Sequence, residues 1–159
     1  MRTILIACGN LLRGDDGAAR RVLDLLGPHS GAELRSVQQL LPELAGEIAD
    51  AELVVFLDAA IDCDGVSVEP VREPEAPPAL THVSRPSEIV ALSRALFGFK
   101  GLAFQCRIPV ADLSTGEGLS PVAEGFAGEA ARILLDLLGH PAGHSGAVRV
   151  GPTSHNFRS

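Results

Sequence analysis

The chain has 159 residues, of which 46% are apolar, and this is enough to bury the hydrophobic core of a single domain. Its net charge of −7 argues against binding to nucleic acid or to an anionic membrane, because both depend on Lys and Arg side chains. No apolar run reaches the roughly 18 residues that a membrane span needs and no secretory pattern opens the chain, so we expect a cytoplasmic protein. The 3 cysteines form no C-x-x-C pair and predict neither a disulfide framework nor a thiolate zinc site.

The first segment pairs a buried strand with a helix. An apolar run predicts a strand over residues 3–8, and helical spacing of apolar residues predicts a helix over residues 18–26. The loop between them places Asp15 and Asp16 at the carboxyl end of the strand. This loop lacks the G-x-G-x-x-G and G-K-[ST] signatures, and its two carboxylates would repel a phosphate, so a bound cation is favoured. The alternative is that Asp15 or Asp16 caps the helix.

A second strand and helix follow. Residues 32–37 predict a strand, and Pro42 opens a helix that places Leu44, Ala45, Ile48 and Ala49 on one side. Residues 53–57 are apolar at every position, which is typical of a strand covered on both faces. Asp58 follows at once, so we expect its carboxylate to leave the core at the tip of this strand.

The middle of the chain predicts an edge strand and a helix. Residues 66–71 alternate in polarity, and Pro70 suits a strand at the edge of a sheet. The Pro-rich residues 73–78 predict a mobile connection. A helix over residues 87–97 is expected to turn Ile89, Val90, Leu92 and Leu96 inward, and His82 lies shortly before it.

The last segments complete an alternating pattern of strands and helices. Residues 102–108 alternate as a strand, and Ser120-Pro121 predicts the start of a helix that reaches Leu138. We therefore expect an α/β fold, a three-layer sandwich with a mostly parallel sheet of the phosphorylase/hydrolase-like kind, in one domain over residues 1–138. Residues 139–159 show no periodicity and predict a flexible tail.

Three polar side chains are candidates for a metal site. Asp16 follows the first strand, Asp58 follows the third, and His82 precedes a helix, while ligands of such sheets bind beyond the carboxyl ends of the strands. Two carboxylates and an imidazole suit a divalent cation such as nickel or zinc, with water completing its coordination. Metal-assisted hydrolysis is then the expected class of reaction. The alternatives are that Asp58 caps a turn and that His82 is an ordinary loop residue.

Four segments in this order resemble the nickel-iron hydrogenase maturation endopeptidases. The run Cys8–Gly17 is similar to their opening Gly-x-Gly-Asn loop with its acidic pair, and Val54–Ala60 is similar to their apolar strand ending in Asp-Ala. Thr81-His82, with the apolar helix after it, is similar to their His segment, and Gly116–Pro121 to the entrance of their last helix. The resemblance covers roughly residues 2–138.

This resemblance implies an aspartic-type endopeptidase that removes the C-terminal extension of its partner, the hydrogenase large-subunit precursor. It implies that Asp16, Asp58 and His82 are the catalytic and metal-contacting residues, and that they engage nickel already loaded into the precursor, with Asp15 as a supporting group. Zinc or cadmium could substitute for nickel in a crystal. It leaves the oligomeric state open.

Two other functions remain as alternatives. A nickel-binding scaffold for hydrogenase assembly would need the same metal ligands but would not cleave a peptide bond. This alternative stays open because residues 38–43, Gln-Gln-Leu-Leu-Pro-Glu, replace the Gly-Thr-x-Gly loop of the family. A glycine-rich loop lets the backbone approach a peptide closely, and this segment does not. Peptidyl-tRNA hydrolases also open with a strand followed by Gly-Asn. They need a basic RNA-binding face and an early catalytic His, whereas this chain is acidic and has no His before His29.

Overall fold

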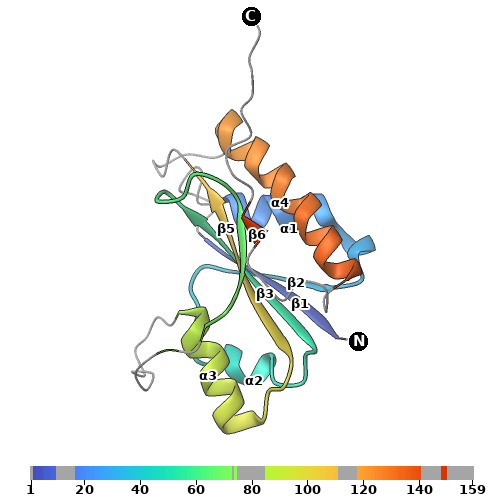
Figure 1. The fold of residues 1–159 in the computed structure, drawn as a ribbon, viewed down its shortest axis with the longest axis vertical. Helices are drawn as coiled ribbons and strands as arrows, with labels where there is room; N and C mark the ends of the chain where they lie inside the picture. Colours follow the sequence, from blue (N-terminus) through green and yellow to red (C-terminus); the bar gives the residue numbers. More distant parts are fainter. Residues whose placement is uncertain are drawn as a thin grey trace, which may run out of the picture.

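The computed structural model describes residues 2–9, 17–72, 74, 85–110, 118–140 and 148–149 of the chain. Within these ranges a six-stranded, mostly parallel sheet lies between two layers of helices, which confirms the predicted three-layer α/β sandwich (Figure 1). No helix in these ranges is long and apolar enough to cross a membrane.

The sheet has the strand order β2-β1-β3-β5-β4-β6. Strands β2, β1, β3 and β5 run parallel to one another, whereas β4 is antiparallel to both β5 and β6. The strands comprise β1 (Thr3–Cys8), β2 (Glu33–Val37), β3 (Leu53–Ala60), β4 (Ser67–Pro70), β5 (Leu102–Pro109) and β6 (Val148–Arg149).

The helices cover both faces of the sheet. Helices α1 and α4 lie side by side on one face, and α2 and α3 lie on the other (Figure 1). Their bounds are α1 (Ala18–Leu26), α2 (Leu44–Glu47), α3 (Pro86–Phe97) and α4 (Pro121–Gly139), and a short 3-10 helix η2 (Pro28–Ser30) precedes β2.

Strand β3 forms the middle of the core, as its uninterrupted apolar run predicts. Val55 and Leu57 pack toward α1 and α4, whereas Val54 and Phe56 pack in the second cluster toward α2 and α3. All four side chains are buried. Because side chains alternate between the faces of a strand, both layers of helices are anchored on this one segment.

Strand β3 does not end where the sequence predicts. It continues through Asp58 to Ala60, because β5 pairs with it up to the Ala60 and Pro109 positions. Strand β1, in contrast, ends at Cys8, whose partner in the register is Asp58. Asp58 therefore lies at the end of the paired β1–β3 segment but inside β3, and its side chain is half-buried.

The helices on the α2 side differ from the prediction in length and orientation. The helix expected to begin at Pro42 spans only Leu44–Glu47. In α3, Leu96 is 66% exposed rather than turned inward. The residue that joins the two helices is Ser93, which is buried and whose Oγ donates a hydrogen bond to the carbonyl of Ala45 at 2.6 Å.

The antiparallel side of the sheet also departs from the prediction. Strand β4 is not at the edge, because Val148 and Arg149 of the predicted tail form β6 and pair with Val68 and Ser67. Pro70 lies beyond this pairing, so its missing N–H costs no ladder hydrogen bond to β6. The predicted connection over residues 73–78 lies outside the described residues, apart from Pro74.

Helix α4 begins as predicted, with Ser120 at the N-cap and Pro121 as the first helical residue. The Ser120 Oγ accepts a hydrogen bond from the Ala123 N–H at 3.2 Å. Replacing Ser120 by Ala is expected to lower the free energy of unfolding by about 1 kcal/mol, because that N–H loses its acceptor. Urea unfolding measures the change, and Ser120→Asp, which restores an acceptor, should unfold like the wild type. Equal loss in both variants would contradict a capping role.

Candidate functional site

The strand order places a topological switch point between β1 and β3. The chain leaves β1 through α1 to reach β2 on one side, and then crosses through α2 to β3 on the other side of β1. Open parallel sheets bind ligands beyond the carboxyl ends of the strands at such a point, where the two connections diverge. Cys8 and Asp58, which are partners in the register, mark this position.

A pocket of about 380 Å³ opens there, at the carboxyl ends of the parallel strands. It lies between the ends of β1 and β3, the segment after β2 and the beginning of α3. A second hollow, of about 460 Å³, lies near Gly101 at the amino ends of β3 and β5, where such sheets do not bind ligands. The residues lining the first pocket are Cys8, Gln38, Gln39, Leu40, Leu57, Asp58, Arg85, Pro86, Ser87 and Gln105.

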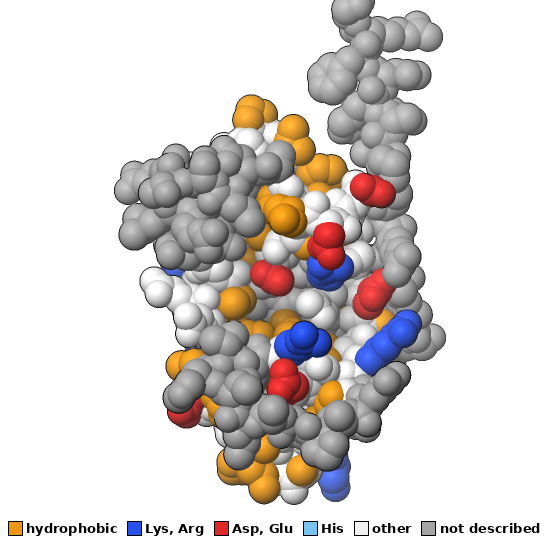
Figure 2. Space-filling view, turned by 90° about the vertical axis from the view of Figure 1, so that its left-hand side faces the viewer, with side chains coloured by type: hydrophobic (Ala, Val, Ile, Leu, Met, Phe, Trp, Pro, Cys, Tyr) orange, Lys and Arg blue, Asp and Glu red, His pale blue; other side chains and the backbone are white. Residues whose placement is uncertain are grey.

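The face at the carboxyl ends of the strands carries both signs of charge. Figure 2 views the molecule from this side and shows acidic and basic side chains close together near the middle of the face. The pocket itself is lined by one carboxylate, that of Asp58, and one guanidinium, that of Arg85. Among the described residues, its other polar side chains are neutral, so the site suits a ligand that combines a charged group with peptide-like polar groups.

Asp58 is held in a row of side chains on the α2 and α3 face of the sheet. It shares this face with Phe56, because residues two apart on a strand point the same way. Its neighbours in the row are Cys8 on β1 and Arg107 on β5. Arg107 also forms an ion pair with Asp62, with 2.5 Å between Nη2 and Oδ1. A half-buried carboxylate in this position can accept a proton or bind a cation.

The cysteines near the site contact backbone carbonyl groups or are buried. The Cys8 thiol contacts the Gln38 carbonyl oxygen at 3.6 Å and so links the end of β1 to the segment after β2. Burial raises the pKa of Cys63, although the charge of Arg107 opposes this, and complete burial raises the pKa of Cys106 to about 12. Cys63 and Cys106 therefore stay protonated at neutral pH, and neither supplies a thiolate nucleophile.

The structure places one of the three predicted site residues, Asp58, in the pocket. Asp16 and His82 lie outside the described residues, so their convergence on Asp58 stays a prediction. No group of three His, Cys, Asp or Glu side chains that could hold a metal occurs within the described ranges. Gly17 holds the N-cap position of α1. The alternative that Asp15 or Asp16 caps this helix concerns residues outside the described ranges and stays a prediction.

Five polar residues of the pocket were not among the predicted site residues, and one of them, Ser87, lies in the first turn of α3. Gln38 and Gln39 follow β2, Arg85 precedes α3, and Gln105 lies within β5. The sequence does contain a signal for Gln38 and Gln39 as site residues, because they come directly after a parallel strand. Asp58 was predicted to be a site residue for the same reason. Gln105 had no such signal, since it lies in mid-strand and reaches the pocket only through its pairing opposite Phe56.

Comparison with solved structures finds the same fold in a group of hydrogenase-processing enzymes. The hydrogenase maturating endopeptidase HybD from Escherichia coli superposes with a TM-score of 0.69 and 19% identity, over 94% of this chain and 98% of that protein. The [NiFe] hydrogenase maturation protease HybD from Thermococcus kodakarensis gives 0.65 and 21%, over 87% and 99%. The protease HycI from the same organism gives 0.64 and 19%, over 87% and 92%. The chain has the fold of the hydrogenase maturation endopeptidases.

This likeness extends over 92–99% of each of these neighbours. No protein-family model matches the sequence, and comparison with curated proteins finds no relative. The solved structures therefore confirm the fold that the resemblance of the four sequence segments implied.

Proposed function

We propose that the chain is an endopeptidase that removes the C-terminal extension of a nickel-loaded hydrogenase large-subunit precursor. The observation that carries this proposal is the position of Asp58, a half-buried carboxylate in a pocket at the switch point of the maturation-endopeptidase fold. The family motif places an acidic residue after the same apolar strand. Together, the fold and the position of this carboxylate support peptide hydrolysis at the carboxyl edge of the sheet.

We propose further that Asp16, Asp58 and His82 together contact the nickel ion of the precursor. Two described residues close to Asp16 and His82 in the chain support this arrangement. Cys8 lies in the pocket at the end of β1, eight positions before Asp16, and Arg85 lies there three positions after His82. Nickel is here part of the substrate. The three side chains would bind only a precursor that carries its metal, so that the peptide bond is cut after nickel has been loaded.

The remaining polar side chains of the pocket suit the peptide itself. The amides of Gln38, Gln39 and Gln105 can each donate and accept hydrogen bonds, which matches the alternating N–H and C=O groups of an extended backbone. Gln38 and Gln39 begin the segment that replaces the Gly-Thr-x-Gly loop of the family. We therefore propose that amide side chains here take over peptide contacts that a glycine-rich loop would make through its backbone.

The direct test is to incubate the chain with a nickel-loaded large-subunit precursor and follow its mass. The expected product is a shortened large subunit together with a released C-terminal peptide. Precursor prepared without nickel should remain intact, because the proposed ligands then lack the ion that they recognise. Intact nickel-loaded precursor that nevertheless co-purifies with the chain would contradict cleavage and favour an assembly scaffold.

A further inference from the structure

Strand β2 forms one edge of the sheet, and no described strand pairs with its outer side. The Gly9 N–H donates to the Val37 carbonyl at 3.0 Å, so the backbone groups of Val37 point toward β1. Because these groups alternate along a strand, those of Glu33 and Arg35 also point toward β1, and those of Leu34 and Ser36 point outward. The outer edge therefore presents a donor and an acceptor at every second residue, which is the pattern that an added strand requires.

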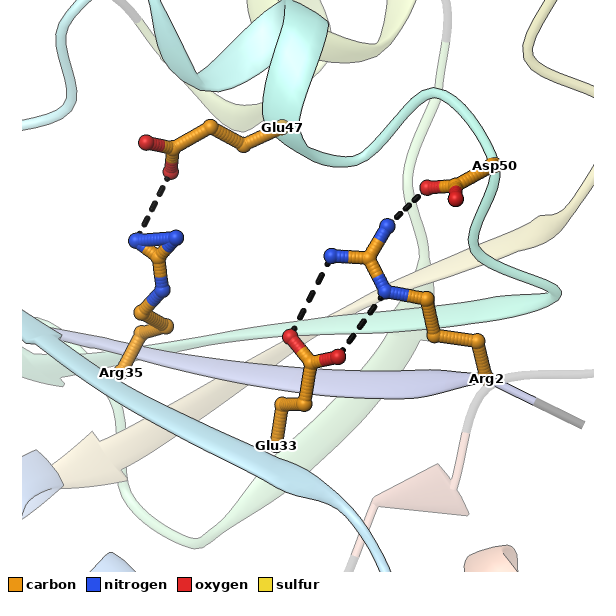
Figure 3. Close-up of polar contacts among 5 residues, drawn as sticks. All are labelled: Arg2, Glu33, Arg35, Glu47 and Asp50. Atoms are coloured by element: carbon orange, nitrogen blue, oxygen red, sulfur yellow. Dashed lines mark hydrogen bonds and ion pairs between the residues drawn. The ribbon is translucent and has the colours of Figure 1, made fainter.

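The charged side chains of β2 are held in ion pairs, so they are not free to keep another strand away from this edge. Glu33 accepts from Arg2 through both carboxylate oxygens, at 2.9 and 3.2 Å, and Arg35 donates to Glu47 at 3.0 Å (Figure 3). Arg2 also contacts Asp50. Exposed edge strands are commonly protected from pairing by charged side chains. Here both charges are held in ion pairs, and the residues with outward backbone groups, Leu34 and Ser36, are uncharged.

A groove follows the same edge and leads to the candidate site. Its volume is about 580 Å³, and it is formed by β2, by α2 and by the segment between them. Gln38 and Gln39 line both this groove and the pocket that contains Asp58, so the two hollows adjoin. The residues lining the groove are Arg35, Val37, Gln38, Gln39, Leu41, Glu43, Leu44 and Glu47.

We propose that β2 binds an extended segment of the protein substrate as an added strand, and that this strand guides the substrate past Gln38 and Gln39 to Asp58. The inference rests on the proposed function and names the docking path of its substrate. Alternate side chains of the added segment lie in the groove, where Val37, Leu41 and Leu44 favour apolar groups. Main-chain hydrogen bonds at Leu34 and Ser36 supply affinity with little demand on substrate sequence.

Ser36 gives a sharp test, because its N–H points away from β1. In Ser36→Pro this outward donor is lost without removing a hydrogen bond of the β1–β2 ladder, and Ser36→Ala keeps the donor and serves as the matched control. We expect kcat/KM for processing of the nickel-loaded precursor to fall at least tenfold in Ser36→Pro and to stay within twofold in Ser36→Ala. Wild-type kcat/KM in a folded Ser36→Pro variant would overturn the inference and leave the proposed function intact.

Amide hydrogen exchange of the wild-type chain tests the same inference without a variant. During turnover of saturating precursor, the Leu34 and Ser36 amides should become protected, whereas the Arg35 and Val37 amides are already protected in the free chain. Protection with no cleavage would support the docking path and contradict the proposed function. No added protection during cleavage would overturn the docking path. Protection of both amides in the free chain, together with a dimer in light scattering, would overturn it as well, since a second copy then occupies the edge.

Discussion

Replacing Asp58 by Asn is expected to lower the rate of precursor processing at least about 100-fold, the lower end of what a positioned acid or base contributes. The Asn side chain has nearly the same shape and can keep a hydrogen bond at this half-buried position. It carries no charge, so it can neither hold a cation strongly nor accept a proton at neutral pH. A time course of precursor mass measures the loss, and thermal unfolding followed by circular dichroism should show a native-like fold.

Asp64→Asn provides the matched control for this prediction. Asp64 is an exposed carboxylate in the turn after β3, six positions further along the chain, and it does not line the pocket. The substitution removes the same charge and should leave the processing rate within about twofold, as for other surface substitutions away from a site. Wild-type processing by Asp58→Asn would remove Asp58 from the site. Equal losses in both variants would point to net charge rather than to the pocket.

Replacing Gly101 by Ala is expected to destabilise the fold by about 3 kcal/mol, the upper part of the range for overpacking. A Cβ atom at this position would lie 2.4 Å from the carbonyl oxygen of Ala51 and 2.8 Å from that of Glu52. Both are backbone atoms just before β3, so they cannot rotate away as a side chain would. Moving them would also disturb the hydrogen bond from the Leu102 N–H to the Glu52 carbonyl, which measures 2.8 Å.

The same substitution at Gly125 should have the opposite sign. Gly125 lies on the exposed side of α4, and a Cβ atom there would meet nothing within 4 Å. Ala is preferred to Gly inside a helix by up to about 1 kcal/mol, so Gly125→Ala should stabilise the protein. Urea unfolding of the two variants compares the effects directly. A Gly101→Ala variant as stable as the wild type would show that the close approach of the β3 and β5 backbones is relaxed in solution.

The candidate site divides into a part that sequence could locate and a part that it could not. Asp58 was found because a charge directly after five apolar residues has to leave the core, and it does lie at the end of the β1–β3 pairing. The exact end of β3 was missed, because pairing with β5 carries the strand two residues further. Arg85 and Gln105 were missed since no local pattern marks them, and only the packing of α3 and the pairing of β5 bring them to the pocket.

The sequence by itself determined most of the strands and helices and the faces that the central strands bury, because apolar periodicity is a local consequence of backbone geometry. Residues 53–57 thus identified a strand with helices on both sides. Tertiary structure alone decided the strand order, the antiparallel β4 and β6, and the open edge of β2. These features depend on contacts between residues far apart in the chain. A periodic apolar pattern indicates that one face of an element is buried, but it does not indicate which other element covers that face.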